Sequence, residues 1–198
     1  IQWSHNQQIM SHLSAIIWTK SMGKTSIATA VAHRTGFGVI TNDTDSSIDE
    51  MLGRGRVLRV TNNQKLPEIN EGYWAIFDGI SGIDEPVVED AIRRSQSIVL
   101  PAVFGVEEVK RVVWTLRKIE SLTDISSKQI VLVANEFFAK SKEEKAWLKE
   151  RLLKIGHPVV TLSDSNYIRE LNYKPEGLDE KVKRLWPMWY WARRSAKQ

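Results

Sequence analysis

The chain contains 198 residues, of which 42% are hydrophobic and 26% are charged, a balance typical of a single globular domain. No apolar run reaches the roughly 18–20 residues that a membrane-spanning helix needs. The first nine residues lack the apolar core of a signal peptide. Cysteine is absent, which excludes disulfides, thiolate metal sites and cysteine nucleophiles. The formal net charge is +4.

Short apolar runs alternate with amphipathic stretches along the chain. The apolar runs predict strands, and apolar residues spaced three or four positions apart predict helices. In chain order we expect strands at 15–18, 38–41, 57–60, 73–77, 97–101, 128–134 and 158–162, and helices at 25–33, 85–95, 106–122 and 140–155. This alternation predicts an α/β fold with a doubly wound, mainly parallel sheet and helices on both faces.

The segment between the first strand and the first helix, 19–25, reads TKSMGKT. A tight loop here can point its backbone N–H groups inward, and the N-terminus of the following helix adds partial positive charge. Lys24 would then reach the terminal phosphates of a nucleotide, and the Thr25 hydroxyl would bind Mg²⁺. The usual pattern has glycine where Trp18 stands, so the alternative is a left-handed turn at Gly23 that merely begins the helix.

Acidic residues follow two of the expected strands. Asp43 and Asp45 come after 38–41, and Asp78 comes after 73–77. Ligands of open parallel sheets bind at the carboxyl ends of the strands, where carboxylates beside a phosphate loop can hold a hydrated Mg²⁺ and orient a water. The alternative is that aspartate is simply common where strands end.

In their order and spacing these motifs resemble the ParA/MinD-type ATPases, the deviant Walker-A branch of the P-loop NTPases. That family has a K-G-G-x-G-K-[ST] loop, a D-x-D element after the next strand, and an apolar strand ending in D-x-x-x-G. The chain matches these motifs with 19–25, 43–45 and 78–82, and Asn135 stands where the family has an adenine-contacting asparagine. The resemblance covers about 13–172.

The resemblance implies a role for each matching residue. Lys24 and Asp45 would act in ATP hydrolysis, with Asp45 orienting the attacking water. Residues that would hold Mg²⁺ are Thr25, Asp43 and Asp78, and residues that would contact the nucleotide are Ser21, Met22, Gly23, Lys24, Thr25, Ser26 and Asn135. The family's first loop lysine reaches the partner's ATP across a dimer. Thr19 replaces it here, so either Lys20 takes this catalytic role or the contact is lost.

The function that the resemblance implies is a switch that binds ATP and Mg²⁺, hydrolyses ATP slowly and positions plasmid or chromosomal DNA. It would be a cytoplasmic protein that can associate with the nucleoid. The implied partners are a second copy, as a homodimer formed on ATP binding, non-specific DNA and a DNA-bound adaptor protein. Two alternatives remain: a MinD-like ATPase that acts at a membrane, and a nucleotide-sensing scaffold with little hydrolysis.

We expect an N-terminal extension at 1–12, the ATPase domain at 13–172 and a basic, aromatic tail at 173–198. Between 174 and 198 there are seven basic and three acidic residues, so this segment alone carries +4. Its cations and tryptophans are consistent with docking on the domain, with DNA binding or with contact to a membrane surface. A second basic segment contains Arg54, Arg56 and Arg59, for which a solvated loop is favoured over contact with DNA or phosphate.

Overall fold

The computed structural model describes residues 11–17, 23–44, 47–53, 55–79, 82–136 and 139–162. The strands within these ranges are β1 (His12–Ile17), β2 (Gly38–Thr41), β3 (Val57–Arg59), β4 (Trp74–Gly79), β5 (Ser97–Ala102), β6 (Gln129–Asn135) and β7 (Val159–Leu162). The helices are α1 (Lys24–Thr35), α2 (Ser47–Leu52), α3 (Pro86–Arg94), α4 (Val106–Leu122) and α5 (Lys142–Leu153), with a short 3₁₀ turn η1 (Ile125–Ser127).

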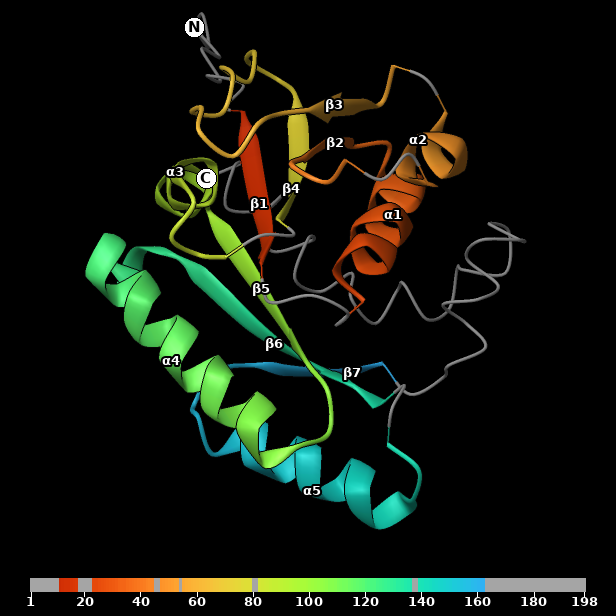
Figure 1. Cartoon of the computed structure of the whole chain (residues 1–198), viewed down its shortest axis with the longest axis vertical. Coiled ribbons are helices and arrows are strands. Elements are labelled where there is room, and N and C mark those ends of the chain that lie inside the picture. The colour runs from red at the N-terminus through yellow and green to blue at the C-terminus, as the bar shows by residue number, and fades with distance from the viewer. Residues whose placement is uncertain are drawn as a thin grey trace, which may run out of the picture.

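The strands form one sheet in the order β3-β2-β4-β1-β5-β6-β7, and every pair of neighbours is parallel. Strand β1 lies at the centre of the sheet, and the twist of the sheet is visible in Figure 1. All carboxyl ends therefore meet at one edge, where parallel α/β sheets bind their ligands.

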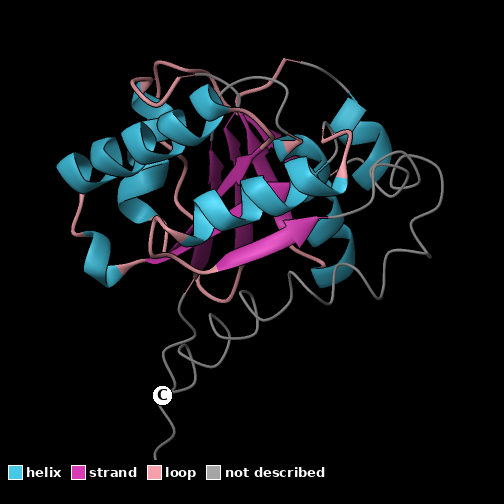
Figure 2. Ribbon diagram, turned by 90° about the horizontal axis from the view of Figure 1, so that it is seen from below, coloured by secondary structure: helices cyan, strands magenta, loops and turns pink. Residues whose placement is uncertain are grey.

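Helices cover both faces of the sheet, as Figure 2 shows. One face packs against α1 and α2 through a cluster that includes Ile27, Val31, Ile48 and Leu52. The other face packs against α3, α4 and α5 through a larger cluster. The predicted doubly wound, parallel α/β fold is therefore confirmed.

The first strand is longer than the apolar run that predicts it. Strand β1 begins at His12, because its two polar residues are buried with partners. Ser14 Oγ lies 2.5 Å from Ser97 Oγ in β5, and His12 Nε2 lies 3.1 Å from Ser14 Oγ. The His12 ring also stacks on Trp74 at 4.4 Å between ring centroids. A search for apolar runs overlooks polar residues that pair across a buried sheet.

In the second basic segment the predicted solvated loop is wrong at Arg56, whereas Arg59 lies in the strand expected at 57–60 and is exposed. Arg56 lies just before β3, where its Nη2 donates to the carbonyl oxygens of Ala32 and Phe37, the latter at 3.0 Å. Arg59 ends β3 and pairs with Asp49 of α2 at 2.5 Å. Arg54 lies outside the described residues.

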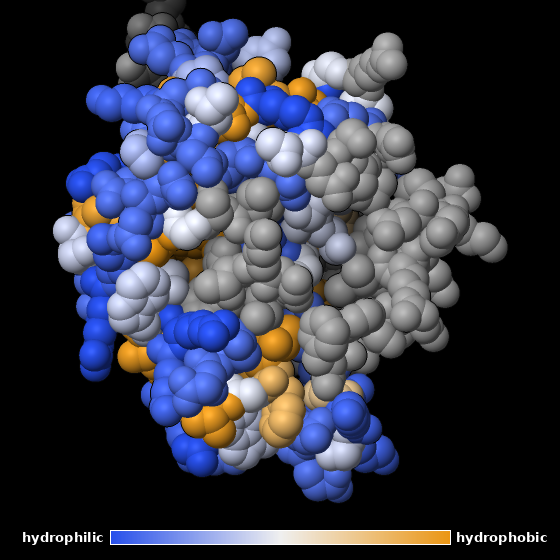
Figure 3. Space-filling view, viewed as in Figure 1, coloured by the Kyte–Doolittle hydropathy of each residue, from blue (hydrophilic) through white to orange (hydrophobic). Residues whose placement is uncertain are grey.

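On the face drawn in Figure 3, the described residues are mostly hydrophilic, with separate hydrophobic spots. Large apolar side chains that are exposed among the described residues include Leu58, Tyr73, Val106, Trp114 and Leu153. Of the helices that the structure describes, none has the length and apolar character needed to cross a membrane.

Candidate functional site

The helix that follows the candidate phosphate loop begins at a glycine in the left-handed conformation. Gly23 has φ 80° and ψ 19°, a region that other residues adopt at a cost. Its carbonyl oxygen accepts the first helical hydrogen bond, from Ile27 N at 3.0 Å. The sharp turn delivers Lys24 and Thr25 to the first turn of α1, whose N-terminus faces the carboxyl edge of the sheet.

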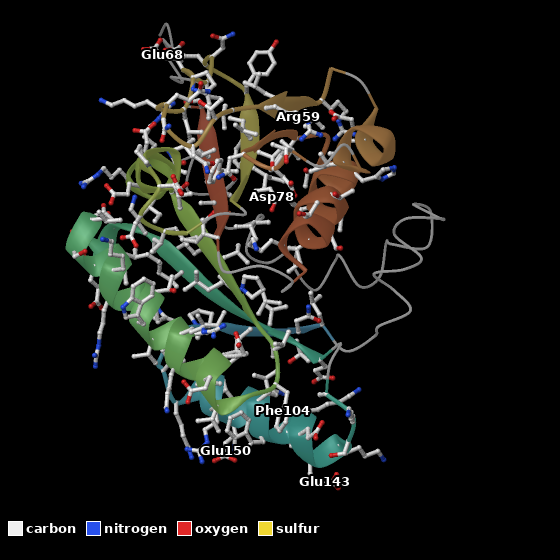
Figure 4. The ribbon with its side chains drawn as sticks, in the orientation of Figure 1. Arg59, Glu68, Asp78, Phe104, Glu143 and Glu150 are labelled. Carbon is white, nitrogen blue, oxygen red and sulfur yellow. The ribbon has the colours of Figure 1, made fainter. Side chains whose placement is uncertain are left out.

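Asp78 lies next to this helix start and is fully buried. Strand β4 is longer at its end than predicted, so Asp78 lies inside the strand, paired with Ile16 of β1 on one side and with Thr41 of β2 on the other. Its Oδ2 accepts a hydrogen bond from Thr25 Oγ1 at 2.8 Å. Its Oδ1 is buried and has no hydrogen-bond partner among the described residues. Figure 4 shows Asp78 between α1 and the central strands.

Burial dominates the electrostatics of this site. It raises the pKa of Asp78 to about 6, against the opposing effects of the Thr25 hydrogen bond and the Lys24 charge. Burial also lowers the pKa of Lys24, against the opposing effects of the Asp78 and Asp43 charges. Lys24 is only 4% exposed. Both charges are thus held where water solvates them poorly, and their mutual attraction only partly offsets the cost.

The segment after β2 is fixed to Asp78 through Thr41. The buried Thr41 hydroxyl donates to the Asp78 carbonyl oxygen at 3.0 Å, and Thr41 Oγ1 in turn accepts from Asp43 N at 3.0 Å. Asp43 is thereby placed near enough for its charge to act on Lys24 and Asp78. Thr41 is a site residue that sequence reasoning missed, although a polar residue closing an apolar strand is a usable signal.

A second link joins the segment after β2 to the segment that leads into α3. Asn42 Nδ2 donates to Asn62 Oδ1 at 2.9 Å, and the Asn62 carbonyl oxygen accepts from Val87 N at 3.1 Å. Asn62 therefore holds together the regions that follow β2 and β4. Nothing in its local sequence distinguishes it from the other polar residues between β3 and β4.

The residues present suit a Mg²⁺ ion that is shared with phosphate groups. Among the described residues, no group of three or more histidine and acidic side chains could hold a metal ion by itself. Mg²⁺ characteristically binds through one or two carboxylates, waters and substrate phosphates instead of an all-protein cage. The buried, unpartnered Oδ1 of Asp78 is the acceptor that such a hydrated ion would need.

The structure brings together Gly23, Lys24, Thr25, Asp43 and Asp78, whereas the other predicted site residues lie apart or outside its described ranges. Ser26 follows Thr25 in α1 and is half-buried. Asn135 is buried at the carboxyl end of β6, two strands from β1, and pairs with Leu162 of β7. Outside the described residues lie Lys20, Ser21, Met22 and Asp45.

No family model and no curated protein matches the chain by sequence. Solved structures match it closely in fold. McdA of Cyanothece superposes with a TM-score of 0.66 and 10% identity, over 90% of this chain and 99% of that chain. A candidate plasmid partition protein of Borrelia burgdorferi B31, bound to AMPPNP, gives 0.61 and 13%, over 89% and 99%. The MinD cell division protein of Aquifex aeolicus gives 0.59 and 14%, over 94% and 98%.

The chain therefore shares the fold of these proteins, and it has a glycine turn, a buried lysine and a buried aspartate at the carboxyl edge of its parallel sheet. More narrowly, this fold is the one seen in McdA and MinD, which match 90% and 94% of the chain. The resemblance drawn from the motifs is confirmed at the level of the fold.

Proposed function

We propose that this chain is an ATP-dependent molecular switch of the ParA/MinD type, in which ATP binding favours one conformation or a homodimer and hydrolysis resets it. The observation that carries the proposal is the joint burial of Lys24 and Asp78 beside the start of α1, with Thr25 donating to Asp78 at 2.8 Å. A buried ammonium and a buried carboxylate at this position suit a ligand with anionic oxygens and a bound cation. Mg-ATP has this chemistry.

Each residue of the site then has a task. Lys24 binds the terminal phosphates, Thr25 and Asp78 hold the hydrated Mg²⁺ with support from Asp43, and Asn135 contacts the adenine. Mg²⁺, when bound, neutralises charge on the phosphates. Ser21, Met22, Gly23 and Ser26 contact the nucleotide, Lys20 takes the role of the family's first loop lysine, and Asp45 orients the attacking water.

The cellular task that we propose is the positioning of DNA, with an adaptor protein as the partner that stimulates hydrolysis. The support is the similarity in fold to a candidate plasmid partition protein and the net charge of +4 within 174–198. A cationic segment of this kind favours polyanions. The similarity to MinD keeps a membrane surface as the alternative.

Titration of the full chain with ATP in the presence of Mg²⁺ tests the proposal. We expect Lys24→Gln to raise the Kd for ATP at least about 100-fold, a loss of about 3 kcal/mol, because it removes one partner of a buried charge pair. Lys128→Gln is the matched control. Burial lowers the pKa of Lys128 as well, but its Nζ donates to Arg93 and Ser95 carbonyl oxygens, away from the site.

Two results would overturn parts of this proposal. If Lys24→Gln binds ATP as the wild type does, the phosphate-binding role of the loop is wrong. If the wild type binds ATP but shows no turnover with DNA and adaptor present, the scaffold function replaces the switch. Co-sedimentation with DNA and with anionic liposomes separates the DNA task from the membrane task.

A further inference from the structure

Arg59 is an arginine at the carboxyl end of β3 that bridges two segments of the candidate site. In the sheet it is the register partner of Thr41 in β2. Its Nη1 donates to the Asp43 carbonyl oxygen, and its Nε and Nη2 donate to Asp49 Oδ2 at 3.2 and 2.5 Å. Figure 4 shows Arg59 beside β3, above Asp78 in that view.

The contact with Asp43 matters because the backbone of Asp43 is held from two sides. Thr41 Oγ1 accepts from Asp43 N at 3.0 Å, and Arg59 donates to the Asp43 carbonyl oxygen. These contacts fix the N–H and the C=O of one residue, so they fix where its carboxylate can lie. That carboxylate is close enough to Lys24 and Asp78 for its charge to act on both.

The contact with Asp49 ties the same arginine to a helix. Asp49 belongs to α2, and α2 packs against α1 because Ile48 and Leu52 share a buried cluster with Ile27 and Val31. The Arg59–Asp49 pair is one-third exposed on each side. An ion pair at such a position adds little stability by itself, and its geometric effect is to hold the guanidinium in line with the Asp43 carbonyl.

We propose that Arg59 is a positioning residue that holds Asp43 in place for the metal side of the nucleotide site. The inference rests on the proposed function, because it concerns how the chain receives Mg-ATP. Mg²⁺ demands nearly ideal octahedral geometry. A small shift of Asp43 should therefore reduce the benefit that Mg²⁺ brings to nucleotide binding. Binding without the metal depends on Lys24 and the loop, whereas the contacts described for Arg59 are with Asp43 and Asp49.

The test compares nucleotide affinity with and without the metal in the full chain. AMPPNP is titrated calorimetrically into each variant, once with Mg²⁺ and once with EDTA. The readout is the Kd in EDTA divided by the Kd with Mg²⁺. We expect Arg59→Ala to lower this ratio about 10- to 100-fold, the loss usual when a residue that orients a metal ligand is removed. The Kd in EDTA should stay within about twofold of wild type. Arg59→Lys should restore part of the ratio. Its single ammonium can reach the Asp43 carbonyl or the Asp49 carboxylate, but it cannot bind both in the geometry of the arginine guanidinium.

Two further variants separate positioning from general loss of an ion pair. Asp49→Ala should lower the ratio less than Arg59→Ala, because the contact with the Asp43 carbonyl remains. Arg111→Ala, which breaks an exposed pair with Glu108 at 3.0 Å on α4, should leave the ratio unchanged. Melting temperatures of all variants are measured without nucleotide.

The outcomes distinguish this inference from the proposed function. If the wild type binds no AMPPNP in either condition, the proposed function fails and the inference fails with it. If the wild type responds to Mg²⁺ and Arg59→Ala responds equally, only the inference is overturned. A rise in Kd that is the same with Mg²⁺ and with EDTA, together with a lower melting temperature, would assign Arg59 a structural role and would also overturn it.

Discussion

Replacing Asp78 by asparagine should stabilise the fold in the absence of nucleotide. The carboxylate is fully buried in β4, and burial raises its pKa from 3.8 to about 6. Asparagine has nearly the same shape, and its Oδ1 can accept the hydrogen bond that Thr25 Oγ1 donates to Asp78 Oδ2. The substitution therefore removes a buried charge while keeping the contact that orients the side chain.

The magnitude follows from the difference between the two pKa values. They differ by about 2 pH units, and each unit corresponds to about 1.4 kcal/mol, so the ionised carboxylate costs about 3 kcal/mol near neutral pH. Some of this gain is offset in the variant because asparagine brings an NH₂ group to the position of Asp78 Oδ1, which has no hydrogen-bond partner among the described residues. We expect a net stabilisation of about 1–3 kcal/mol at pH 7.5, or about 3–10 °C in melting temperature.

The sign of the pH dependence is part of this prediction. An acid whose pKa is raised in the folded state favours folding when it is protonated, and that contribution is lost as the pH rises from 3.8 through about 6. The advantage of Asp78→Asn should accordingly be largest above pH 6, smaller at pH 5 and nearly absent at pH 4. Urea unfolding followed by circular dichroism at these values measures it. Glu68→Gln, at an exposed position between β3 and β4, is the control and should change stability by less than about 0.5 kcal/mol.

The same variant should lose what the wild type gains from its ligand. Mg-ATP should raise the melting temperature of the wild type but not that of Asp78→Asn, because the acceptor for the hydrated cation is gone. Two results would refute the reasoning. One is a variant less stable than wild type at pH 7.5, and the other is a gain that is the same at pH 5 and pH 7.5.

Two further predictions concern regions outside this site. Burial lowers the pKa of His12 from 6.5 to about 4, so the stability that the neutral ring contributes should be lost as the pH falls through this range. His12→Phe should be less sensitive to acid between pH 6.5 and 4 in urea unfolding, and an unchanged pH profile would contradict the burial of this ring. In the tail, the variant replaces four residues by alanine: Lys183, Arg184, Arg193 and Arg194. It should weaken binding to all DNA sequences alike and flatten a log–log dependence of affinity on salt whose slope is roughly −3 to −4. Unchanged DNA affinity would contradict DNA binding by the tail.

The sequence predicted the architecture because each apolar run is long enough to bury and is followed by an amphipathic helix. The strand at 38–41 and the helix at 106–122 agree with β2 and α4 residue for residue. Helix α2 was not predicted, since it has six residues and its stability depends on packing against α1. Short helices carry too little periodicity to be seen in a sequence.

The motifs also predicted which residues of the candidate site would meet, but not the contacts that hold them there. Thr25 and Asp78 are 53 residues apart, but their hydrogen bond could be expected because the order of the motifs places the start of α1 beside the end of β4. Arg59 and Asp43 are 16 residues apart, and their contact depends on how β3 is aligned with β2. Register is fixed by packing over the whole sheet, so the local pattern around Arg59 did not predict its contact with Asp43.

The buried charges of the site favour a role in ligand binding over a role in stability. Burial shifts the pKa of Lys24 downward and that of Asp78 upward, so each group is pushed towards its neutral form although the two have opposite charges. If the pair existed only to hold α1 against β4, apolar residues would do so at lower cost. A ligand with phosphate oxygens for Lys24 and a hydrated cation for Asp78 would compensate both groups at once. The stability that the fold forgoes in burying these charges would then reappear as binding energy, which is why Asp78→Asn should strengthen the fold and weaken its response to Mg-ATP.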